Sequence, residues 1–271
     1  NLRARFGEDA CSHYTYFFCG DGDLAEGISH ESASFAGHQR LGRLIGVYDD
    51  NHISIDGPTE LALSDDAVKR FEGYGWHVID LGESGEDLDA IENAFHQAKS
   101  EDERPSLIIL RTHIGTPSPD IDTADVHGYS LKEDKIADTK KKMGLPEDET
   151  FYCPQEVLDF YRAAGRRGAS ARDEWVESLR NASIDVESWE ACQSGTGLHG
   201  WQEHVPSWGA GESVATRKAS NICFQTLSEY VPGLIGGGAD LTGNTGTSLE
   251  GFGVQSAECP EGRQIYFGVR E

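Results

Sequence analysis

The feature that most constrains the fold is an alternation of apolar runs with amphipathic stretches over the first 145 residues. In a parallel sheet the buried strands are short apolar runs, and the crossover helices between them carry apolar residues at helical spacing. We predict strands at residues 14–19, 43–48, 77–81 and 106–112. The predicted fold class is therefore α/β, with a parallel sheet and crossover helices.

The stretches between these runs carry helix signals. Ser64 is a candidate N-cap, because Asp65 and Asp66 follow it where acidic side chains favour the start of a helix. Residues 82–99 repeat apolar side chains at helical spacing, and a further helix is expected to begin at Ser130.

The sequence pattern divides the chain into three parts. Residues 1–150 form the predicted sheet domain. Residues 151–212 begin with a helical pattern and then become rich in Gly, Ser and Trp without periodicity, which is typical of a linker region. A new helix pattern, followed by apolar runs at 234–239 and 264–269, indicates that 213–271 is the start of a second α/β domain.

Composition narrows the possible partners and the compartment. Asp and Glu total 47 and Lys and Arg total 23, so the net charge is −24, which repels nucleic acid and anionic membranes. The acidity favours solubility and also fits a salty cytosol. The six cysteines form no CxxC pair, which favours a reducing cytoplasm over a disulfide-rich or zinc-binding protein. Because residue 1 is Asn and the single Met is Met143, we expect an internal fragment of a longer protein.

Two polar turns follow the first two predicted strands. The motif Gly-Asp-Gly stands at 20–22, and Asp-Asp-Asn stands at 49–51. If these strands are neighbours, Asp21, the amide oxygen of Asn51 and a main-chain carbonyl near Ile53 can converge at the carboxyl edge of the sheet. Hard oxygen ligands suit magnesium, with calcium or manganese as alternatives, and diphosphate oxygens would complete the coordination.

Either motif alone is more often an ordinary turn, but together they are specific. Gly-Asp-Gly, 28 further residues and then Asn is the fingerprint of enzymes that use thiamine diphosphate. The sequence GDGDLAEGISHESASFAGHQRLGRLIGVYDDNHISIDG resembles transketolases over its whole length. Further blocks agree with that family, namely DDAVKRFEGYGWHVI, RPSLIILRTHIG, a His-Gly turn at 127–128, ATRKAS, GGGADLTGNT and YFGVRE.

The resemblance implies the thiamine-diphosphate-binding fold and assigns its first set of site residues. In transketolases the matching positions make Asp21, Asn51 and the backbone of Ile53 metal ligands, and Asn51 also lies in the cofactor site. Gly22 would contact the diphosphate. Glu26 matches a glutamate near the cofactor at a contact between subunits.

The resemblance also implies residues that contact the thiamine ring or the substrate. Ile55 matches an apolar residue that supports the bent shape of the cofactor, and His127 matches a histidine that binds near the cofactor and transfers protons. Arg217 would bind the sugar phosphate, and Asn244 stands where the family usually has a serine of the same phosphate site. Glu271 matches the glutamate that activates the aminopyrimidine ring.

The function implied is that of a transketolase, which transfers a two-carbon ketol reversibly from a ketose phosphate to an aldose phosphate in the pentose phosphate pathway. Transketolases are homodimers with active sites between subunits. This chain carries the diphosphate half of the site and only the first residue, Glu271, of the pyrimidine half, so the chain alone is expected to be inactive. Dihydroxyacetone synthase and deoxyxylulose phosphate synthase are alternatives within the same cofactor class. A non-catalytic module that binds metal and diphosphate is an alternative from another class.

Overall fold

The computed structural model describes residues 1–270, which fall into two compact units. One unit comprises residues 13–168, and the other comprises residues 1–12 together with the chain from 169 onward. The chain passes from one unit to the other after residue 12 and again within the long helix α8 (Gln155–Asn181).

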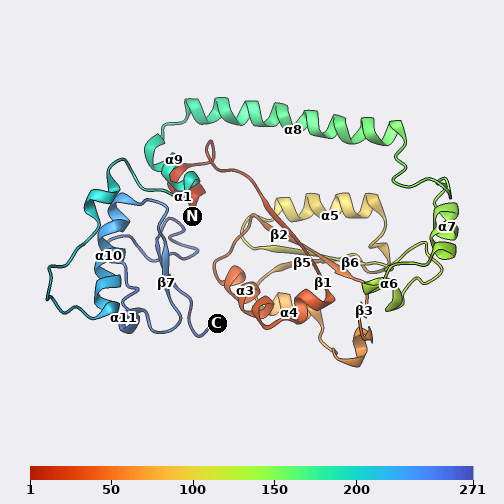
Figure 1. The fold of residues 1–271 in the computed structure, drawn as a ribbon, viewed down its shortest axis with the longest axis horizontal. Coiled ribbons are helices and arrows are strands. Elements are labelled where there is room, and N and C mark those ends of the chain that lie inside the picture. Colours follow the sequence, from red (N-terminus) through yellow and green to blue (C-terminus); the bar gives the residue numbers. More distant parts are fainter. Residues whose placement is uncertain (271) are drawn as a thin grey trace. The chain divides into compact units, whose positions relative to one another are not determined.

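The unit formed by 13–168 is built on a four-stranded parallel sheet in the order β1-β2-β6-β5 (Figure 1). Its strands are β1 (Thr15–Gly20), β2 (Leu44–Asp50), β5 (His77–Asp80) and β6 (Ser106–Arg111). All four predicted strands are confirmed, with ends that differ by no more than two residues. The predicted α/β class with a parallel sheet is confirmed.

Helices cover both faces of this sheet (Figure 1). α2 (Asp21–Ala25), α3 (Gly27–His38) and α4 (Ala67–Gly73) pack on one face, and α5 (Leu88–Ser100) packs on the other. Neighbouring residues of β6 point to opposite faces, so fully buried Leu107 joins the first core and fully buried Ile108 joins the second. Burial on both faces explains why the strands are continuous apolar runs.

Two predicted helix starts were wrong. α4 begins at Ala67, and its cap is Asp66, whose carboxylate accepts a hydrogen bond of 3.0 Å from the Lys69 N–H, rather than Ser64. The side chain directly before the first helical residue reaches the N–H groups of the first turn, and Ser64 lies too far upstream. The helix expected at Ser130 begins instead at Glu133, as α7 (Glu133–Lys142), without a side-chain cap.

Short elements complete the unit of residues 13–168. Their bounds are β3 (Ile53–Ser54), β4 (Gly57–Pro58), η1 (Thr59–Leu61), η2 (Gly82–Ser84) and α6 (Asp125–Gly128). The helical pattern predicted at 82–99 therefore divides into η2 and α5, and α5 is capped by Asp87.

The second unit joins the first residues of the chain to much later ones. Its elements are α1 (Leu2–Phe6), α9 (Val186–Ser194), η3 (Trp201–His204), α10 (Thr216–Tyr230), β7 (Gly236–Gly238), α11 (Thr242–Thr245) and β8 (Gln264–Tyr266). The Phe6 ring packs edge-on against Trp189 at 5.3 Å between centroids. β7 and β8 pair in parallel, so both strands predicted in this part are present in shortened form.

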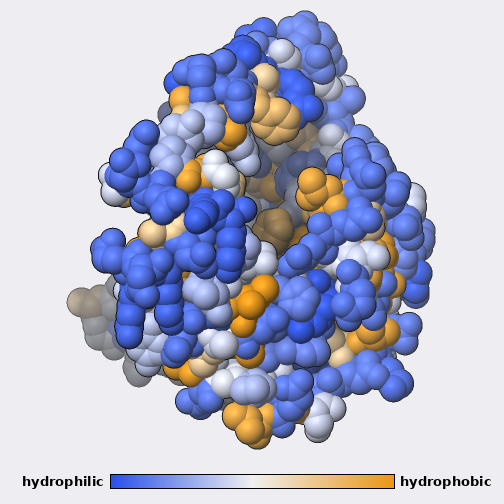
Figure 2. Space-filling model, turned by 90° about the vertical axis from the view of Figure 1, so that its right-hand side faces the viewer, coloured by the Kyte–Doolittle hydropathy of each residue, from blue (hydrophilic) through white to orange (hydrophobic). Residues whose placement is uncertain are grey.

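The face seen in Figure 2 is mostly hydrophilic, with hydrophobic side chains scattered among polar ones. Over residues 1–270, no helix combines the length and the apolar character needed to cross a membrane.

Candidate metal and diphosphate site

Asp21 and the turn after β2 meet at the carboxyl edge of the sheet. β1 and β2 are parallel neighbours, with Gly20 opposite Asp49, so the residues that follow both strands lie at the same edge. The backbone N–H of His52 donates a hydrogen bond of 3.2 Å to Oδ2 of Asp21. The proximity expected from the two sequence motifs is therefore present.

Asp21 shares one hydroxyl with a second carboxylate. The Tyr48 hydroxyl lies 2.8 Å from Oδ1 of Asp21 and also 2.8 Å from Oδ1 of Asp50. A phenol has a single proton to donate, so it satisfies one of the two carboxylates at a time. The position between the two carboxylates therefore favours an additional positive charge.

The electrostatic surroundings of Asp21 also favour a bound cation. Burial raises the pKa of Asp21 above its ordinary value, and the charge of Asp50 raises it further, against the hydrogen bonds from Tyr48 and His52. Burial and the same two carboxylates also raise the pKa of Tyr48, which keeps its hydroxyl protonated. Asp21 is only 8% exposed, so its negative charge is poorly solvated in the absence of a cation.

Asn51 and Ile53 form a tight turn beside this carboxylate. Oδ1 of Asn51 accepts a hydrogen bond of 3.0 Å from the Ile53 N–H, and Nδ2 donates to Asp49 at 3.2 Å. The intervening His52 has a φ of 62°, which reverses the chain direction within the turn. The amide oxygen keeps a second lone pair for another partner.

The carbonyl of Ile53 is also available to a ligand. Ile53 lies opposite Pro58 in the short β3–β4 hairpin, and the adjacent hydrogen bond runs from the Thr59 N–H to the His52 carbonyl at 3.0 Å. Ile53 and Pro58 are therefore a non-hydrogen-bonded pair, in which the carbonyl of each residue points away from the partner strand. One carboxylate, one amide oxygen and one carbonyl oxygen form a hard donor set that fits magnesium.

A polar hollow opens beside Asp21. It is lined by Tyr48, Asp50, His52 and Arg70, among others. Within residues 1–270 no group of three or more His, Cys, Asp or Glu side chains is arranged to hold a metal ion. A metal bound at Asp21 would therefore depend on amide and carbonyl oxygens and on oxygens of its ligand.

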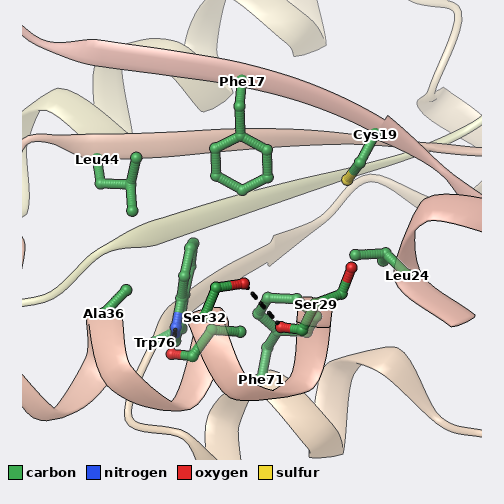
Figure 3. Close-up of a pocket in the computed structure, with 10 residues that line it drawn as sticks. Phe17, Cys19, Leu24, Ser29, Ser32, Ala36, Leu44, Phe71 and Trp76 are labelled. Atoms are coloured by element: carbon green, nitrogen blue, oxygen red, sulfur yellow. Dashed lines mark hydrogen bonds between the residues drawn. The ribbon is translucent and has the colours of Figure 1, made fainter. Parts of the chain in front are cut away.

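A separate hollow, beneath β1 and β2 and against α3, is apolar (Figure 3). Phe17, Leu44 and Trp76 supply much of its wall. The two serines at its edge bond to helix backbone, Ser32 Oγ to Ile28 O at 2.7 Å and Ser29 Oγ to Asp23 O. This hollow presents hydrocarbon and no charged group, so it does not suit a diphosphate.

Residues 1–191 match the family model described as transketolase, thiamine diphosphate binding domain. The chain belongs to the transketolase family. Over its whole length it is 41% identical to a transketolase of Nostoc sp., and over 98% of its length it is 40% identical to a transketolase of Aquifex aeolicus. The chain spans 42% and 39% of these two relatives, about two fifths of their length.

Solved structures of transketolases have the same fold. The structure from Campylobacter jejuni covers all of this chain with a TM-score of 0.90 at 31% identity. A Pichia stipitis transketolase in complex with sedoheptulose 7-phosphate covers 95% of it with a TM-score of 0.88 at 36% identity. The chain spans 41% and 40% of these two proteins.

Two further residues suggested by the likeness to transketolases lie near one another. His127 is exposed on α6, and Ile55 is 62% exposed at the tip of the β3–β4 hairpin. A methyl group placed on Gly128 would lie 3.8 Å from Cγ1 of Ile55, so the His127 turn and this hairpin tip are adjacent. Both elements follow strands at the same edge of the sheet as Asp21.

The other two site residues predicted within 13–168, Gly22 and Glu26, lie at the start and at the end of α2. Gly22 lies in the first turn of α2, with no atom within 4 Å of the position where a Cβ would stand. Its backbone is therefore open to a ligand. Glu26 is exposed where α2 ends and precedes the first residue of α3.

The second unit brings the predicted phosphate residues together. Arg217 Nη1 donates to the main-chain carbonyl of Asn244 at 3.5 Å, a long hydrogen bond between α10 and α11. Both side chains are exposed. Glu271 lies outside the described residues.

Sequence reasoning missed Tyr48 and Asp50. Tyr48 ends an apolar run, and its aromatic ring fits a buried strand without any special role. The useful signal was a tyrosine two residues before Asp50, because a strand places residues 48 and 50 on the same face.

Proposed function

We propose that the protein containing this chain is a transketolase, which transfers a two-carbon ketol reversibly from a ketose phosphate to an aldose phosphate with thiamine diphosphate. The observation that carries the proposal is the convergence of Asp21, Asn51 and Ile53 at one edge of the sheet. The identity to named transketolases along the whole chain supports it. Solved transketolases from Pichia stipitis in complex with xylulose 5-phosphate and with sedoheptulose 7-phosphate support sugar phosphates as substrates.

The proposed metal is magnesium, with calcium or manganese as possible substitutes. Asp21 would supply a carboxylate oxygen, Asn51 its amide oxygen and Ile53 its carbonyl oxygen, while the backbone at Gly22 would donate to the diphosphate. A cation here would neutralise the buried charge shared by Asp21 and Asp50. Thiamine diphosphate, when bound, supplies the nucleophilic carbon atom of the reaction.

The residues of this chain then orient the reactants and move protons. We propose that His127 binds the substrate near the reacting carbon and transfers a proton there, and that Ile55 supports the cofactor ring. Glu271 is proposed to hydrogen-bond the aminopyrimidine ring.

Substrate phosphate and subunit contacts complete the proposal. Arg217 would bind the sugar phosphate through its guanidinium fork, with Asn244 donating from the neighbouring loop. Glu26 is proposed to lie at a contact between the two subunits of a homodimer, and the protein to act in the pentose phosphate pathway of the cytoplasm. We also propose residues 1–150, 151–212 and 213–271 as a diphosphate-binding domain, a linker region and the start of a pyrimidine-binding domain.

The test is an assay of the full-length protein with xylulose 5-phosphate and ribose 5-phosphate. We expect sedoheptulose 7-phosphate to form when magnesium and thiamine diphosphate are present. A preference for formaldehyde as acceptor would indicate dihydroxyacetone synthase, and decarboxylation of pyruvate would indicate deoxyxylulose phosphate synthase. Binding of thiamine diphosphate without turnover of any of these substrates would indicate a non-catalytic module.

A further inference from the structure

A side-chain contact closes the loop that leads from β6 to α6. Nδ1 of His113 lies 2.7 Å from Oδ2 of Asp122, and the Asp122 N–H donates to the Ile114 carbonyl at 3.0 Å. A side-chain contact and a backbone hydrogen bond therefore tie the two ends of this ten-residue loop together. Asp122 has a φ of 58°, a conformation that an aspartate tolerates better than most residues but that still needs support from its surroundings.

The closed loop is attached to the rest of its unit at both ends. The backbone N–H of His113 donates to Oε1 of Glu86 at 3.0 Å, in the turn before α5. On the other side of the loop the Lys135 ammonium bonds to the Asp120 carboxylate, which connects the loop to α7. The loop therefore has fixed neighbours on two sides.

The position of His127 follows from this closure. A Cβ on Gly115 would lie 2.7 Å from Cγ2 of Val126, so the start of the loop packs directly against the residue before His127. The imidazole of His127 is exposed and makes no hydrogen bond to any of residues 1–270. Its placement depends on the backbone of α6, and that backbone rests on the closed loop.

We propose that the His113–Asp122 pair is a positioning element that holds α6 so that His127 reaches the substrate. The inference rests on the proposed function, because it assigns the pair a task in the proposed reaction. In this role His113 acts through the backbone of α6 and His127, not by touching the reacting atoms itself.

The decisive experiment is a double-mutant cycle on the full-length protein with magnesium and thiamine diphosphate. We expect His113→Ala to lower kcat/KM for ketol transfer about tenfold or more, because small displacements of a reacting group cost that much in rate. His127→Ala should lower it further, and adding His113→Ala to His127→Ala should cause no additional loss. Independent, multiplicative losses would overturn the proposal and indicate that His113 acts directly.

Three controls separate positioning from general damage. His96→Ala removes an exposed histidine that lies 4.0 Å from Glu92 on α5, and it should leave kcat/KM unchanged. His113→Gln, which keeps a donor for Asp122, should restore most of the activity lost in His113→Ala. The Kd for thiamine diphosphate, measured by calorimetry, should stay within about twofold of wild type in both His113 variants, and a large loss of affinity would overturn the proposal.

Hydrogen exchange supplies a readout that does not depend on turnover. In His113→Ala the amides of residues 123–128 should exchange faster, while those of β6 keep their wild-type protection. Unchanged exchange in 123–128 would overturn the proposal. If instead His127→Ala has full activity, the role proposed for His127 fails, and exchange still reports whether the pair holds the loop.

Discussion

At the scale of single residues, the Asp21 carboxylate is costly to the folded chain and useful to its ligand. It is buried, it faces Asp50, and the two share one phenol proton from Tyr48. When the pKa of a carboxyl group is raised in the folded state, ionisation of that group lowers the free energy of unfolding. A bound cation would remove that cost, so the same feature that weakens the metal-free fold strengthens binding.

Replacing Asp21 with Asn should therefore stabilise the metal-free protein and abolish its response to magnesium. Because burial raises the pKa of Asp21 in the folded state, the penalty is absent below its ordinary value of 3.8 and grows as pH rises through the elevated value. We expect the difference in Tm between D21N and wild type, measured in EDTA, to increase from pH 4 to pH 7. A difference that stays constant or shrinks over this range would contradict the prediction.

The Tyr48 hydroxyl should stabilise the fold by donating a hydrogen bond to the carboxylate pair of Asp21 and Asp50. Tyr48→Phe keeps the ring in the core and removes the only proton that the hydroxyl offers to Asp21 and Asp50. We expect a loss of about 1–3 kcal/mol in the free energy of unfolding without metal, the usual cost of an unsatisfied buried polar group. Urea unfolding in EDTA measures this loss, and Tyr161→Phe on exposed α8 is the matched control, with no expected change.

The sequence indicated Asp21 and Asn51 but not Tyr48, whose hydroxyl donates to Asp21. Polar residues directly after apolar strands are conspicuous, and the parallel topology places them at one edge. A tyrosine at the end of a strand has no such contrast with its neighbours. Its role depends on which helix covers that face of the sheet, and α2 does so only in the folded unit.

At the scale of elements, strands were predicted better than helix ends. An apolar run fixes a buried strand because both faces must be covered, whereas a helix start depends on one side chain at one position. β3 and β4 have two residues each, which is too short for any periodicity to appear in the sequence. That hairpin nevertheless positions both Ile53 and Ile55.

The corrected start of α4 gives a direct comparison between two neighbouring residues. Asp66→Ala should lower the free energy of unfolding at pH 7, whereas Ser64→Ala should leave it unchanged. Hydrogen bonds from the Lys69 ammonium and backbone hold the pKa of Asp66 below its ordinary value. The charge-dependent part of the D66A deficit should therefore be present above about pH 4, the ordinary pKa of an aspartate, and disappear as pH falls through the lowered pKa. Chemical unfolding at pH 7 and pH 3 tests this, and an equal loss in S64A would indicate that Ser64 also caps the helix.

At the scale of the whole molecule, local patterns predicted the fold class but not which distant segments fold together. The first twelve residues pack with residues after 169, through Phe6 and Trp189 and through a hydrogen bond of 3.0 Å from Trp175 to Ala10. An apolar residue in a short helix does not specify its partner. Such pairings depend on tertiary packing, which periodicity does not encode.

The net charge of −24 predicts how the molecule responds to salt. The chain has 23 cationic and 47 anionic side chains, so repulsion between like charges exceeds attraction within ion pairs. Added salt screens both, and the net effect is therefore to relieve repulsion. The screening length falls from about 30 Å at 0.01 M to about 3 Å at 1 M salt. We expect Tm at pH 7 to rise as potassium chloride increases over this range. Replacing exposed Glu83, Glu103 and Glu174 with Gln should reduce the slope of Tm against salt concentration, and a Tm that falls with added salt would show that attraction between charges dominates.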